Sequence, residues 1–407
     1  MTDHAAAKPP HEAGASSDGW PAWRRVALGG GGGMFIGIGL GRFSYTAMVP
    51  ALISSGELTA LEAGRVGALN FAGFALGALI SVWLSARLGA VRTLAIAAVL
   101  SVIALVASAA PLGFAWLGFW RGLVGITSGI IMVMCLALIA ATAPSGRRPV
   151  AASFVFAGVG LAIFITGILV PRLLAHSLFA AWLGLAACGF AAMCLAIWGW
   201  RGAPQAATTP SPAHARGAAA GPSPWSWPLW LLLASYFFFS VAIVPHTLYW
   251  VDYLARGLAL GMAEGGFHWS IVGVASIAGP WSMAALGLWL GTAMALPLSF
   301  IALGLGIGAP LVSSAGGVLL LSSVLFGAQP GLSALMAARV RDLADAEHMP
   351  RLMRAMILSS SAGAVVAGAI LPQIYEATMS HVLIFAIGGA AMLIGGLLVV
   401  PWERARR

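Results

Sequence analysis

The sequence predicts an all-α membrane protein in which twelve transmembrane helices form two six-helix bundles. Three observations predict this fold. The chain is 60% hydrophobic and only 8% charged, whereas soluble domains are about 25% charged. Residues 269–338 contain no Asp, Glu, Lys or Arg. A polar segment near the middle divides the apolar runs into two equal sets. A water-soluble fold of this length would need far more polar surface.

Apolar runs and helix breakers place the spans in order. One bilayer crossing needs about 20 residues, so the charge-free segment holds about three spans, interrupted at Gly291 and at the Gly308–Pro310 corner. The first bundle is predicted at 26–53, 65–84, 93–110, 114–143, 150–174 and 178–200. The second is predicted at 229–253, 267–290, 292–312, 316–338, 352–374 and 382–401. Glycines at four-residue spacing, such as Gly73 and Gly77, predict close packing between helices.

Three polar segments flank and divide the bundles. Residues 1–25 are expected to form a disordered cytoplasmic tail, and residues 402–407 form a short second tail. Residues 201–227 are rich in Pro, Ala, Ser and Thr, which is typical of a flexible linker. The predicted domains are therefore an N-terminal six-helix half at 26–200 and a C-terminal half at 228–401, joined by this cytoplasmic linker.

Basic residues are distributed unevenly among the loops. With the N-terminus in the cytoplasm, sixteen of the 21 Lys and Arg residues fall on the cytoplasmic side, as the positive-inside rule predicts. The same parity places both termini in the cytoplasm. The net charge of +9 follows from this distribution, and the basic residues form no stripe of the kind that binds nucleic acid. We therefore expect the lipid bilayer, and not nucleic acid, as the partner.

Sequence motifs for enzymatic or metal chemistry are missing. Gly29–Gly33 is not a phosphate-binding loop, because apolar residues follow it where Lys and Ser or Thr are required. The three cysteines lie inside apolar runs and are interpreted as packing residues. His176, His268 and His381 are expected near outer loops, apart from acidic clusters. We expect no enzyme activity, no cofactor and no metal site.

Two arginines within the predicted spans are the main candidates for substrate binding. Arg42 lies near the middle of the first span, and Arg121 lies below the outer end of the fourth. An Arg at mid-helix costs at least about 2.5–3.5 kcal/mol to insert, and no acidic residue occurs in the spans of the N-terminal half. A buried guanidinium needs an anion, carbonyls or water. An anionic substrate would satisfy this need; the alternative is that either arginine binds backbone carbonyls or reaches toward the interface.

Four further residues are candidates for the substrate site. Tyr45 lies one turn after Arg42 and offers an aromatic ring with a hydroxyl. Asn70 and Tyr236 are polar side chains within other spans. Gln329 is followed by Pro and Gly, which predicts a local helix break of the kind that often lines a binding cavity. A simple kink is the alternative at Gln329.

The seventh span carries the candidate proton-coupling residues, His246 and Asp252. Histidine commonly changes charge near neutral pH, so His246 is a candidate for linking proton entry to substrate movement. Its alternative is a hydrogen-bonded packing residue that follows Pro245. The alternative for Asp252 is an ion pair with Arg256, four residues later.

Local motifs add a family resemblance to this architecture. Arg121 followed by Gly125 matches the Arg-x-x-x-Gly signature of the fourth helix in the major facilitator superfamily. Arg87, Gly89 and Arg92 partly match its loop pattern Asp-Arg-x-Gly-Arg-Arg between spans two and three. The chain therefore resembles that superfamily, which implies the MFS fold and a gating role for Arg87, Gly89 and Arg92. The acidic residue of the loop pattern is replaced by Ala86.

Two longer strings resemble the bacterial YbfB/YjiJ-like group within this superfamily. They are GLGRFSYT at residues 39–46 and the segment from Val244 to Gly257. The resemblance implies a multi-pass protein of the bacterial inner membrane that transports a small molecule, without naming its cargo.

The functional prediction is a secondary active transporter that works by alternating access. The expected cargo is a small organic anion, protons are the candidate coupling ion, and the protein is expected to be monomeric. One alternative is a drug or metabolite exporter in which aromatic contacts dominate binding. An alternative of another class is a membrane sensor that does not transport.

Overall fold

The computed structural model describes residues 21–203 and 225–400. Helices form nearly all of this part of the chain. Twelve helical segments within it, of 18 to 33 residues, are long and apolar enough to cross a membrane, since about 20 residues suffice. The predicted all-α fold with twelve spans is therefore confirmed. Residues 1–20, most of the predicted 201–227 linker and residues 401–407 lie outside the described part.

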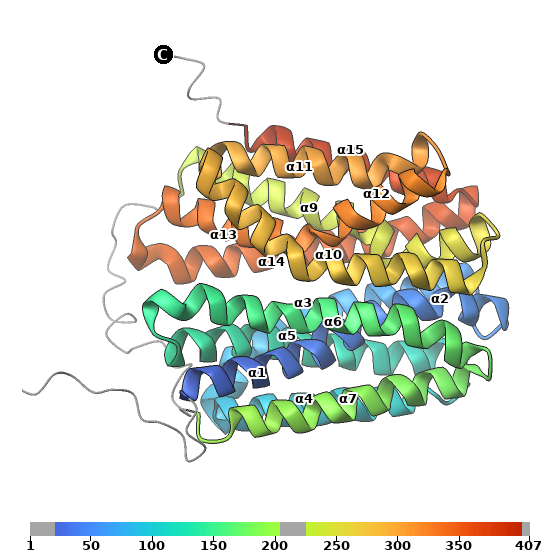
Figure 1. Ribbon diagram of the computed structural model, residues 1–407, viewed down its shortest axis with the longest axis horizontal. Helices are drawn as coiled ribbons and strands as arrows, with labels where there is room; N and C mark the ends of the chain where they lie inside the picture. Colours follow the sequence, from blue (N-terminus) through green and yellow to red (C-terminus); the bar gives the residue numbers. More distant parts are fainter. Residues whose placement is uncertain (1–20, 204–224, 401–407) are drawn as a thin grey trace, which may run out of the picture.

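The helices group into two halves, which Figure 1 shows one above the other. The N-terminal half contains α1 (Ala22–Met34), the π-helix η1 (Phe35–Phe43), α2 (Ser44–Ser54), α3 (Ala60–Leu88), α4 (Ala90–Ala107), α5 (Gly113–Thr142), η2 (Ser145–Arg147), α6 (Arg148–Leu174) and α7 (Leu178–Trp200). The C-terminal half contains α9 (Trp227–Asp252), the π-helix η3 (Tyr253–Gly257), α10 (Gly261–Leu290), α11 (Thr292–Gly308), η4 (Ala309–Leu311), α12 (Gly316–Gly327), α13 (Gln329–Leu343), η5 (Ala346–His348), α14 (Met349–Thr378) and α15 (His381–Leu398).

Several helix ends differ from the predicted boundaries. The second and third spans were expected to end at 84 and begin at 93, but α3 continues to Leu88 and α4 begins at Ala90. A single residue makes this turn because Gly89 adopts φ +84°, a conformation open to glycine at little cost. Gly291, with φ +72°, makes the corresponding turn between α10 and α11. The predicted break at Gln329 is confirmed, since α12 ends at Gly327 and α13 starts at Gln329.

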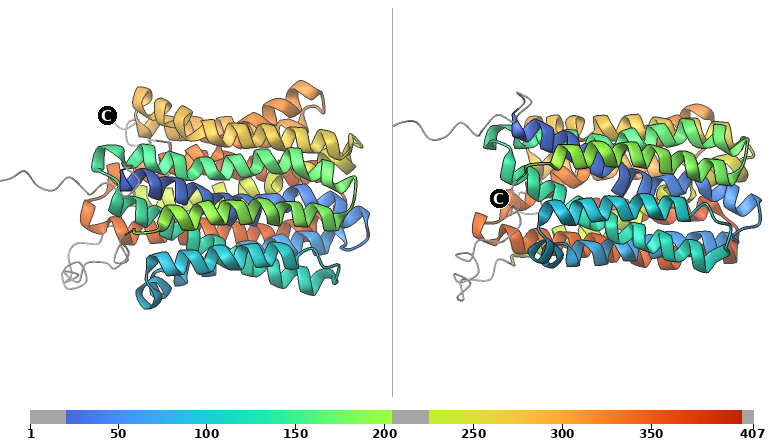
Figure 2. Two further views of the ribbon diagram at one scale, coloured as in Figure 1. Left: turned by 60° about the horizontal axis from the view of Figure 1, so that its bottom comes forward. Right: turned by 90° about the horizontal axis from the view of Figure 1, so that it is seen from below.

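The helices run side by side along the long axis of the molecule (Figures 1 and 2). We call the end that holds the start of α1 and the end of α15 the terminus side, and the opposite end the far side. Within the N-terminal half, α3 and α5 are in direct backbone contact. A β-carbon added at Gly73 would lie 2.2 Å from the Gly122 carbonyl oxygen, and one at Gly125 would lie 2.2 Å from that of Asn70. The predicted glycine-mediated packing is present here.

The two halves meet through α6 and α10, α3 and α14, and α2 and α9. The closest approaches lie toward the far side. A β-carbon at Gly167 would lie 2.4 Å from the Gly266 carbonyl oxygen, and one at Gly64 would lie 2.4 Å from Pro372 Cγ. Thr46 also donates a hydrogen bond to the Thr247 carbonyl. These positions show that the far-side ends of the two halves are tightly packed.

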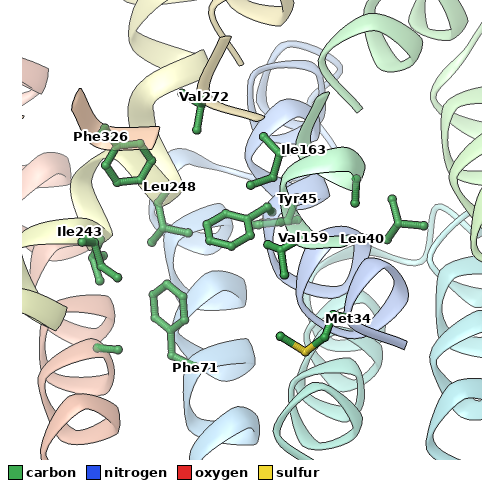
Figure 3. Close-up of a cluster of buried hydrophobic side chains, with 14 of the residues drawn as sticks. Met34, Leu40, Tyr45, Phe71, Val159, Ile163, Ile243, Leu248, Val272 and Phe326 are labelled. Atoms are coloured by element: carbon green, nitrogen blue, oxygen red, sulfur yellow. The ribbon is translucent and has the colours of Figure 1, made fainter. Parts of the chain in front are cut away.

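Apolar side chains from both halves fill the space next to these contacts. In Figure 3, Tyr45 and Phe71 of the N-terminal half face Leu248 and Ile243 of the C-terminal half. All four belong to one continuous buried cluster, and further hydrophobic side chains that are only partly buried pack against it. The apolar core therefore continues across the boundary between the halves, and any polar group at this boundary has apolar neighbours.

Candidate functional site

Arg42 lies in the π-helix η1, inside the first span. Small residues allow this segment to approach its neighbours. A β-carbon at Gly39 would lie 2.2 Å from Ala162 Cβ of α6, and one at Gly41 would lie 2.8 Å from Ser128 Oγ of α5. π-Helical turns within longer helices occur often at functional sites. The glycines therefore seat a widened helical turn deep in the N-terminal half, with Arg42 on it.

Aromatic rings surround the Arg42 guanidinium. Its Cζ atom lies 4.5 Å from the centroid of the Phe71 ring, 5.8 Å from Phe43 and 5.9 Å from Phe74. The side chain is only partly buried, and its Nε atom is buried without a hydrogen-bond partner. Cation–π contacts of this kind stabilise a guanidinium without neutralising its charge.

A small cavity lies in front of Arg42, on the boundary between the two halves. It measures about 30 Å³, which is room for about one water molecule. Its lining comes from α3, α9 and α14: Phe71, Phe74, Ser240, Ile243, Ser360, Ser361 and Ala364. The hydroxyls of Ser240 and Ser360 are 2.6 Å apart. The cavity thus joins one cation to neutral hydroxyls and aromatic faces.

Tyr236 is connected to this cavity, and Gln329 is not. The Tyr236 hydroxyl is within hydrogen-bonding reach of Ser333 and Ser360, so it lies one residue behind the cavity wall. Gln329 is buried at the start of α13, outside the cavity lining. Next to it, a β-carbon at Gly331 would lie 2.4 Å from the Gly279 carbonyl oxygen of α10. The break at Gln329 therefore serves helix packing within the C-terminal half.

Arg121 has a different environment from Arg42. It is 1% exposed, and its Nη2 atom donates a hydrogen bond to the Gly41 carbonyl. Its Cζ atom lies 5.3 Å from the Tyr45 ring and 5.8 Å from the Trp182 ring. Arg121 thus binds the backbone of the residue that precedes Arg42, which is the carbonyl-bonding alternative considered from the sequence.

Asn70 binds the same carbonyl. Its Nδ2 atom donates to the Gly41 oxygen at 3.2 Å and to the Arg121 oxygen at 2.8 Å. A π-helix shifts the register of backbone hydrogen bonds, and two side chains from α3 and α5 here converge on one carbonyl of η1. Asn70 and Arg121 are therefore positioned to fix the backbone from which Arg42 projects.

Tyr45 does not pair with Arg42 as its spacing suggested. Its ring faces Arg121, and its hydroxyl donates to the Ala63 carbonyl at 2.9 Å. Residues at i and i+3 share a face in a regular α-helix, whereas a π-helical turn shifts the helical register. The π-helical turn ends at Phe43, between the two residues, and changes their relative direction.

Neither arginine has an acidic partner. No Asp or Glu among the described residues lies within 4 Å of the Arg42 or Arg121 guanidinium; the ion pairs of this part of the chain involve other residues. The charge of Arg121 faces a carbonyl dipole and two aromatic rings, while the charge of Arg42 faces a cavity. The boundary between the halves therefore carries an uncompensated positive charge at Arg42.

His246 lies inside the C-terminal half, away from the Arg42 cavity. Its ring stacks between Trp250 and Phe326, at 4.5 and 4.6 Å between centroids. Ser322 donates to the Gly306 carbonyl at 2.7 Å, so the His246 Nε2 atom donates to Ser322 across 2.9 Å. The imidazole is fully buried, and its Nδ1 atom has no hydrogen-bond partner.

Asp252 forms the expected pair with Arg256, and His381 also binds its carboxylate. Arg256 Nε donates to Oδ1 at 2.5 Å and Arg256 Nη2 to Oδ2 at 2.8 Å. His381 Nε2 donates to Oδ2 at 2.8 Å. His268 and His381 were expected apart from acidic clusters, and each has a single acidic neighbour: Asp252 for His381, and Glu264, at 3.5 Å, for His268. Helix packing brings Asp252 and His381 together across 129 positions of sequence.

The predicted gating residues lie at the terminus side. The Arg87 Cζ atom lies 5.1 Å from the Trp83 ring of its own helix, Gly89 makes the turn to α4, and Arg92 is exposed. The described residues contain no cluster of three or more His, Cys, Asp or Glu side chains suited to a metal ion.

Sequence reasoning missed the other walls of the Arg42 cavity. Phe71 and Phe74 are spaced three residues apart in α3, and Ser359–Ser361 forms a polar run inside the apolar helix α14. The serine run was a usable signal, because three consecutive hydroxyls are unusual in a lipid-facing segment. The phenylalanines carried no such signal, since aromatic residues are common throughout the spans.

The sequence and the fold were compared with known proteins. Residues 34–400 match the profile of a family described as "Uncharacterised MFS-type transporter YbfB". No curated protein matches the chain. Among solved structures, the fold is similar to a D-xylose-proton symporter, with TM-score 0.75, 15% identity and coverage of 94% of this chain and 98% of that one.

Peptide transporters have a similar fold. A peptide transporter POT in complex with sulfate gives a TM-score of 0.72 at 16% identity, with 96% of each chain covered. A POT family transporter in complex with a thioalcohol-conjugated peptide gives 0.72 at 13% identity, with 94% of this chain and 96% of that one covered. At such identities the likeness concerns the fold. The family profile spans nearly the whole described chain, so the protein belongs to the YbfB-type family of MFS transporters.

Proposed function

We propose that this transporter carries a small organic anion by alternating access, and that Arg42 is the group that binds the anion. One observation carries the proposal. The Arg42 guanidinium is partly exposed to a cavity between the halves, and no carboxylate of the described chain lies within 4 Å of it. A carboxylate of the cargo would accept two parallel N–H bonds from the planar guanidinium.

The charge of Arg42 favours an anionic over a cationic cargo, and the opposite wall is compatible with an anion. Ser240, Ser360 and Ser361 offer neutral hydroxyls, which are able to donate to an oxygen anion. A cation in this position would face a positive charge within the same small space. Tyr236 completes the hydroxyl network from behind Ser360.

The small size of the cavity implies that the two halves must move apart before cargo binds. With about 30 Å³, it does not hold an organic acid until the halves separate. Because the far-side ends are tightly packed, a cargo would enter this conformation from the terminus side. In the alternate conformation the terminus-side ends would close, and the Gly89 turn with Arg87 and Arg92 would take part in that closure.

Topology and coupling complete the proposal. We propose a monomer in a bacterial inner membrane, with the terminus side facing the cytoplasm; the concentration of basic residues at that side supports this orientation. Protons are the proposed coupling ion. His246 and Asp252 are the buried histidine and carboxylate of α9, and Asp252 lies at the boundary between the halves.

The test is uptake into proteoliposomes that contain purified protein. The probes are a panel of radiolabelled mono-, di- and tricarboxylates, with tetraphenylphosphonium as a lipophilic cation. We expect Arg42→Ala to lower uptake of the transported carboxylate by about 100-fold, because a charge-assisted bidentate contact is lost, and Arg42→Lys to retain part of the activity. Arg172→Ala, which changes an exposed arginine of the same half, is the matched control and should transport normally.

Two results would contradict the proposal. One is carboxylate uptake that is unchanged in Arg42→Ala. The other is saturable uptake of the cation, equal in the wild type and in Arg42→Ala, with no carboxylate transported. That second result would favour an exporter whose cargo binds the rings of Phe71 and Phe74.

A further inference from the structure

Asp252, Arg256 and His381 form a buried charged triad near the far side of the C-terminal half. The Asp252 carboxylate accepts two hydrogen bonds from Arg256 and one from His381. The exposed fraction of its side chain is 1%, against 10% for His381 and 30% for Arg256. The three residues come from the end of α9, from η3 and from the first position of α15. The triad thus reaches from a dry interior to the far-side surface.

One edge of the triad lies on the boundary between the two halves. Asp252, Tyr249 and Tyr375 line a space shared with apolar residues of α2 and α3, and that space is too small for a water molecule. The Tyr249 hydroxyl is buried there without a hydrogen-bond partner. A β-carbon at Gly64 of α3 would lie 3.0 Å from it. Separation of the halves would therefore bring the first water to both Tyr249 and Asp252.

The other edge faces the far-side solution. Because His381 Nε2 donates to the carboxylate, its Nδ1 atom is the one that accepts a proton. That Nδ1 atom lies beside Gly257, where a β-carbon would be 3.1 Å from it, and Gly257 is exposed. Arg256 lines an open pocket of about 420 Å³ at the same end. Protons from the far side therefore have a short route to His381.

Other titratable groups near the triad do not balance its charge. α9 and η3 contribute Tyr249 and Tyr253, α14 contributes Tyr375 and the exposed Glu376, and α10 contributes the pair Glu264 and His268. From the N-terminal half, α2 and α3 line the shared space with apolar residues only. Tyr45 of α2 also lies near Tyr249, but its hydroxyl is bonded to the Ala63 carbonyl.

We propose that this triad is a proton-binding site that controls the far-side gate. With His381 neutral, the charges of Asp252 and Arg256 cancel, and the dry boundary is stable. A proton on Nδ1 leaves a net charge of +1 beside a space without water, which is unfavourable unless the charge is hydrated. The state in which the far-side ends separate lets water in, so it binds the proton more tightly. Lower pH on the far side therefore shifts the population toward far-side opening.

This inference rests on the alternating-access and proton-coupling parts of the proposed function but not on the anion. The test is hydrogen–deuterium exchange of the purified full-length protein at about pH 5.5 and about pH 8, corrected for the intrinsic pH dependence of exchange. The reporter peptides cover residues 60–71 and 364–378 at the far side. Residues 94–107 of α4, which packs against α5 and α7 within the N-terminal half, are the internal reference. In the wild type we expect exchange of the reporters to rise by about threefold at the lower pH.

Two substitutions are expected to change hydrogen–deuterium exchange of the reporter peptides in opposite directions. His381→Gln cannot take up the proton, so its reporters should stay protected at both pH values. Asp252→Asn leaves Arg256 uncompensated, so its reporters should exchange quickly at both pH values. A general loosening of the fold would instead accelerate exchange in both variants. Glu376→Gln changes an exposed carboxylate of α14 and should behave like the wild type.

The outcomes separate this inference from the anion proposal. Arg42→Ala should keep the full pH response, whatever its uptake of carboxylates. A wild type without a pH response, or a His381→Gln protein that keeps it, would overturn the proton site and leave the role of Arg42 intact. Protection of the reporters in Asp252→Asn at both pH values would also overturn it.

Discussion

Arg42 and Arg121 are the same side chain at similar depth in the same half, yet their surroundings differ. Arg121 is enclosed by α1–α7, donates to the Gly41 carbonyl and packs on Tyr45 and Trp182. Arg42 follows Gly41 in the π-helix η1. Its side chain extends toward the boundary between the halves, where it contacts the Phe71 ring and lines a cavity. A guanidinium within the membrane needs a partner in either position.

The difference shows how one half builds its candidate site. The interior arginine donates to the backbone through Nη2, and its Nε and Nη1 atoms are enclosed without partners. The guanidinium at the boundary instead lines a cavity. Asn70 adds a second bond to the Gly41 carbonyl. The arrangement therefore separates the residues that position the site from the residue that contacts the cargo. Three substitutions test this division.

The largest effect on stability is expected for Arg121→Ala. The substitution removes a side chain that is 1% exposed, opens a space between two aromatic rings and deletes a hydrogen bond. Together these changes cost about 2–4 kcal/mol and should lower the melting temperature by about 5 °C. Arg42→Ala, which loses no hydrogen bond seen in the described chain, should cost less than about 1 kcal/mol. Tryptophan fluorescence during heating in nanodiscs measures both, and equal losses of stability would remove the distinction.

A smaller effect is expected for Asn70→Ala. It deletes two buried hydrogen bonds, each worth about 1 kcal/mol, but leaves Arg121 on the Gly41 carbonyl. The melting temperature should fall by about 3 °C. Transport should show a raised KM with a nearly unchanged maximal rate, because Arg42 is present but less well held. The control is Gln373→Ala, which removes an exposed amide side chain of α14, and a loss of maximal rate alone would argue against a positioning role for Asn70.

The smallest effect is expected for Phe71→Leu. The substitution keeps an apolar side chain but removes the ring 4.5 Å from the Arg42 Cζ atom. A cation–π contact contributes about 0.5–1 kcal/mol, so the anion affinity should weaken by about 2- to 5-fold. Phe74→Leu, whose ring is 5.9 Å away, should have a smaller effect on the same concentration series. If Phe74 proves the more important ring, the orientation assigned to Arg42 is wrong.

The fold was predictable because its signals are local. Each span is a run of apolar residues long enough to cross a bilayer, and the turn at Gly291 is visible as a glycine inside a charge-free segment. Helix ends were less accurate where one glycine makes the whole turn, as at Gly89. Hydropathy changes gradually across such a turn, whereas the backbone reverses direction at a single residue.

The candidate site was predictable only in part. The sequence identified Arg42 and Arg121 as unusual, because charged residues are rare in spans, but it treated them alike. Tyr45 was expected beside Arg42 from helical spacing, and the π-helical turn moved it to Arg121. For Asp252 the sequence offered Arg256 as a partner, and the packing of α15 against α9 added His381.

The sequence by itself determined that the chain crosses a membrane twelve times, in two halves, with cations in its interior. Those properties follow from the cost of placing each residue in hydrocarbon, and this cost is a sum over local composition. Only the tertiary structure decided that Arg121 meets a carbonyl, Arg42 a cavity and Asp252 a histidine. Such partners come from different helices. Local composition does not determine which faces of those helices pack against each other.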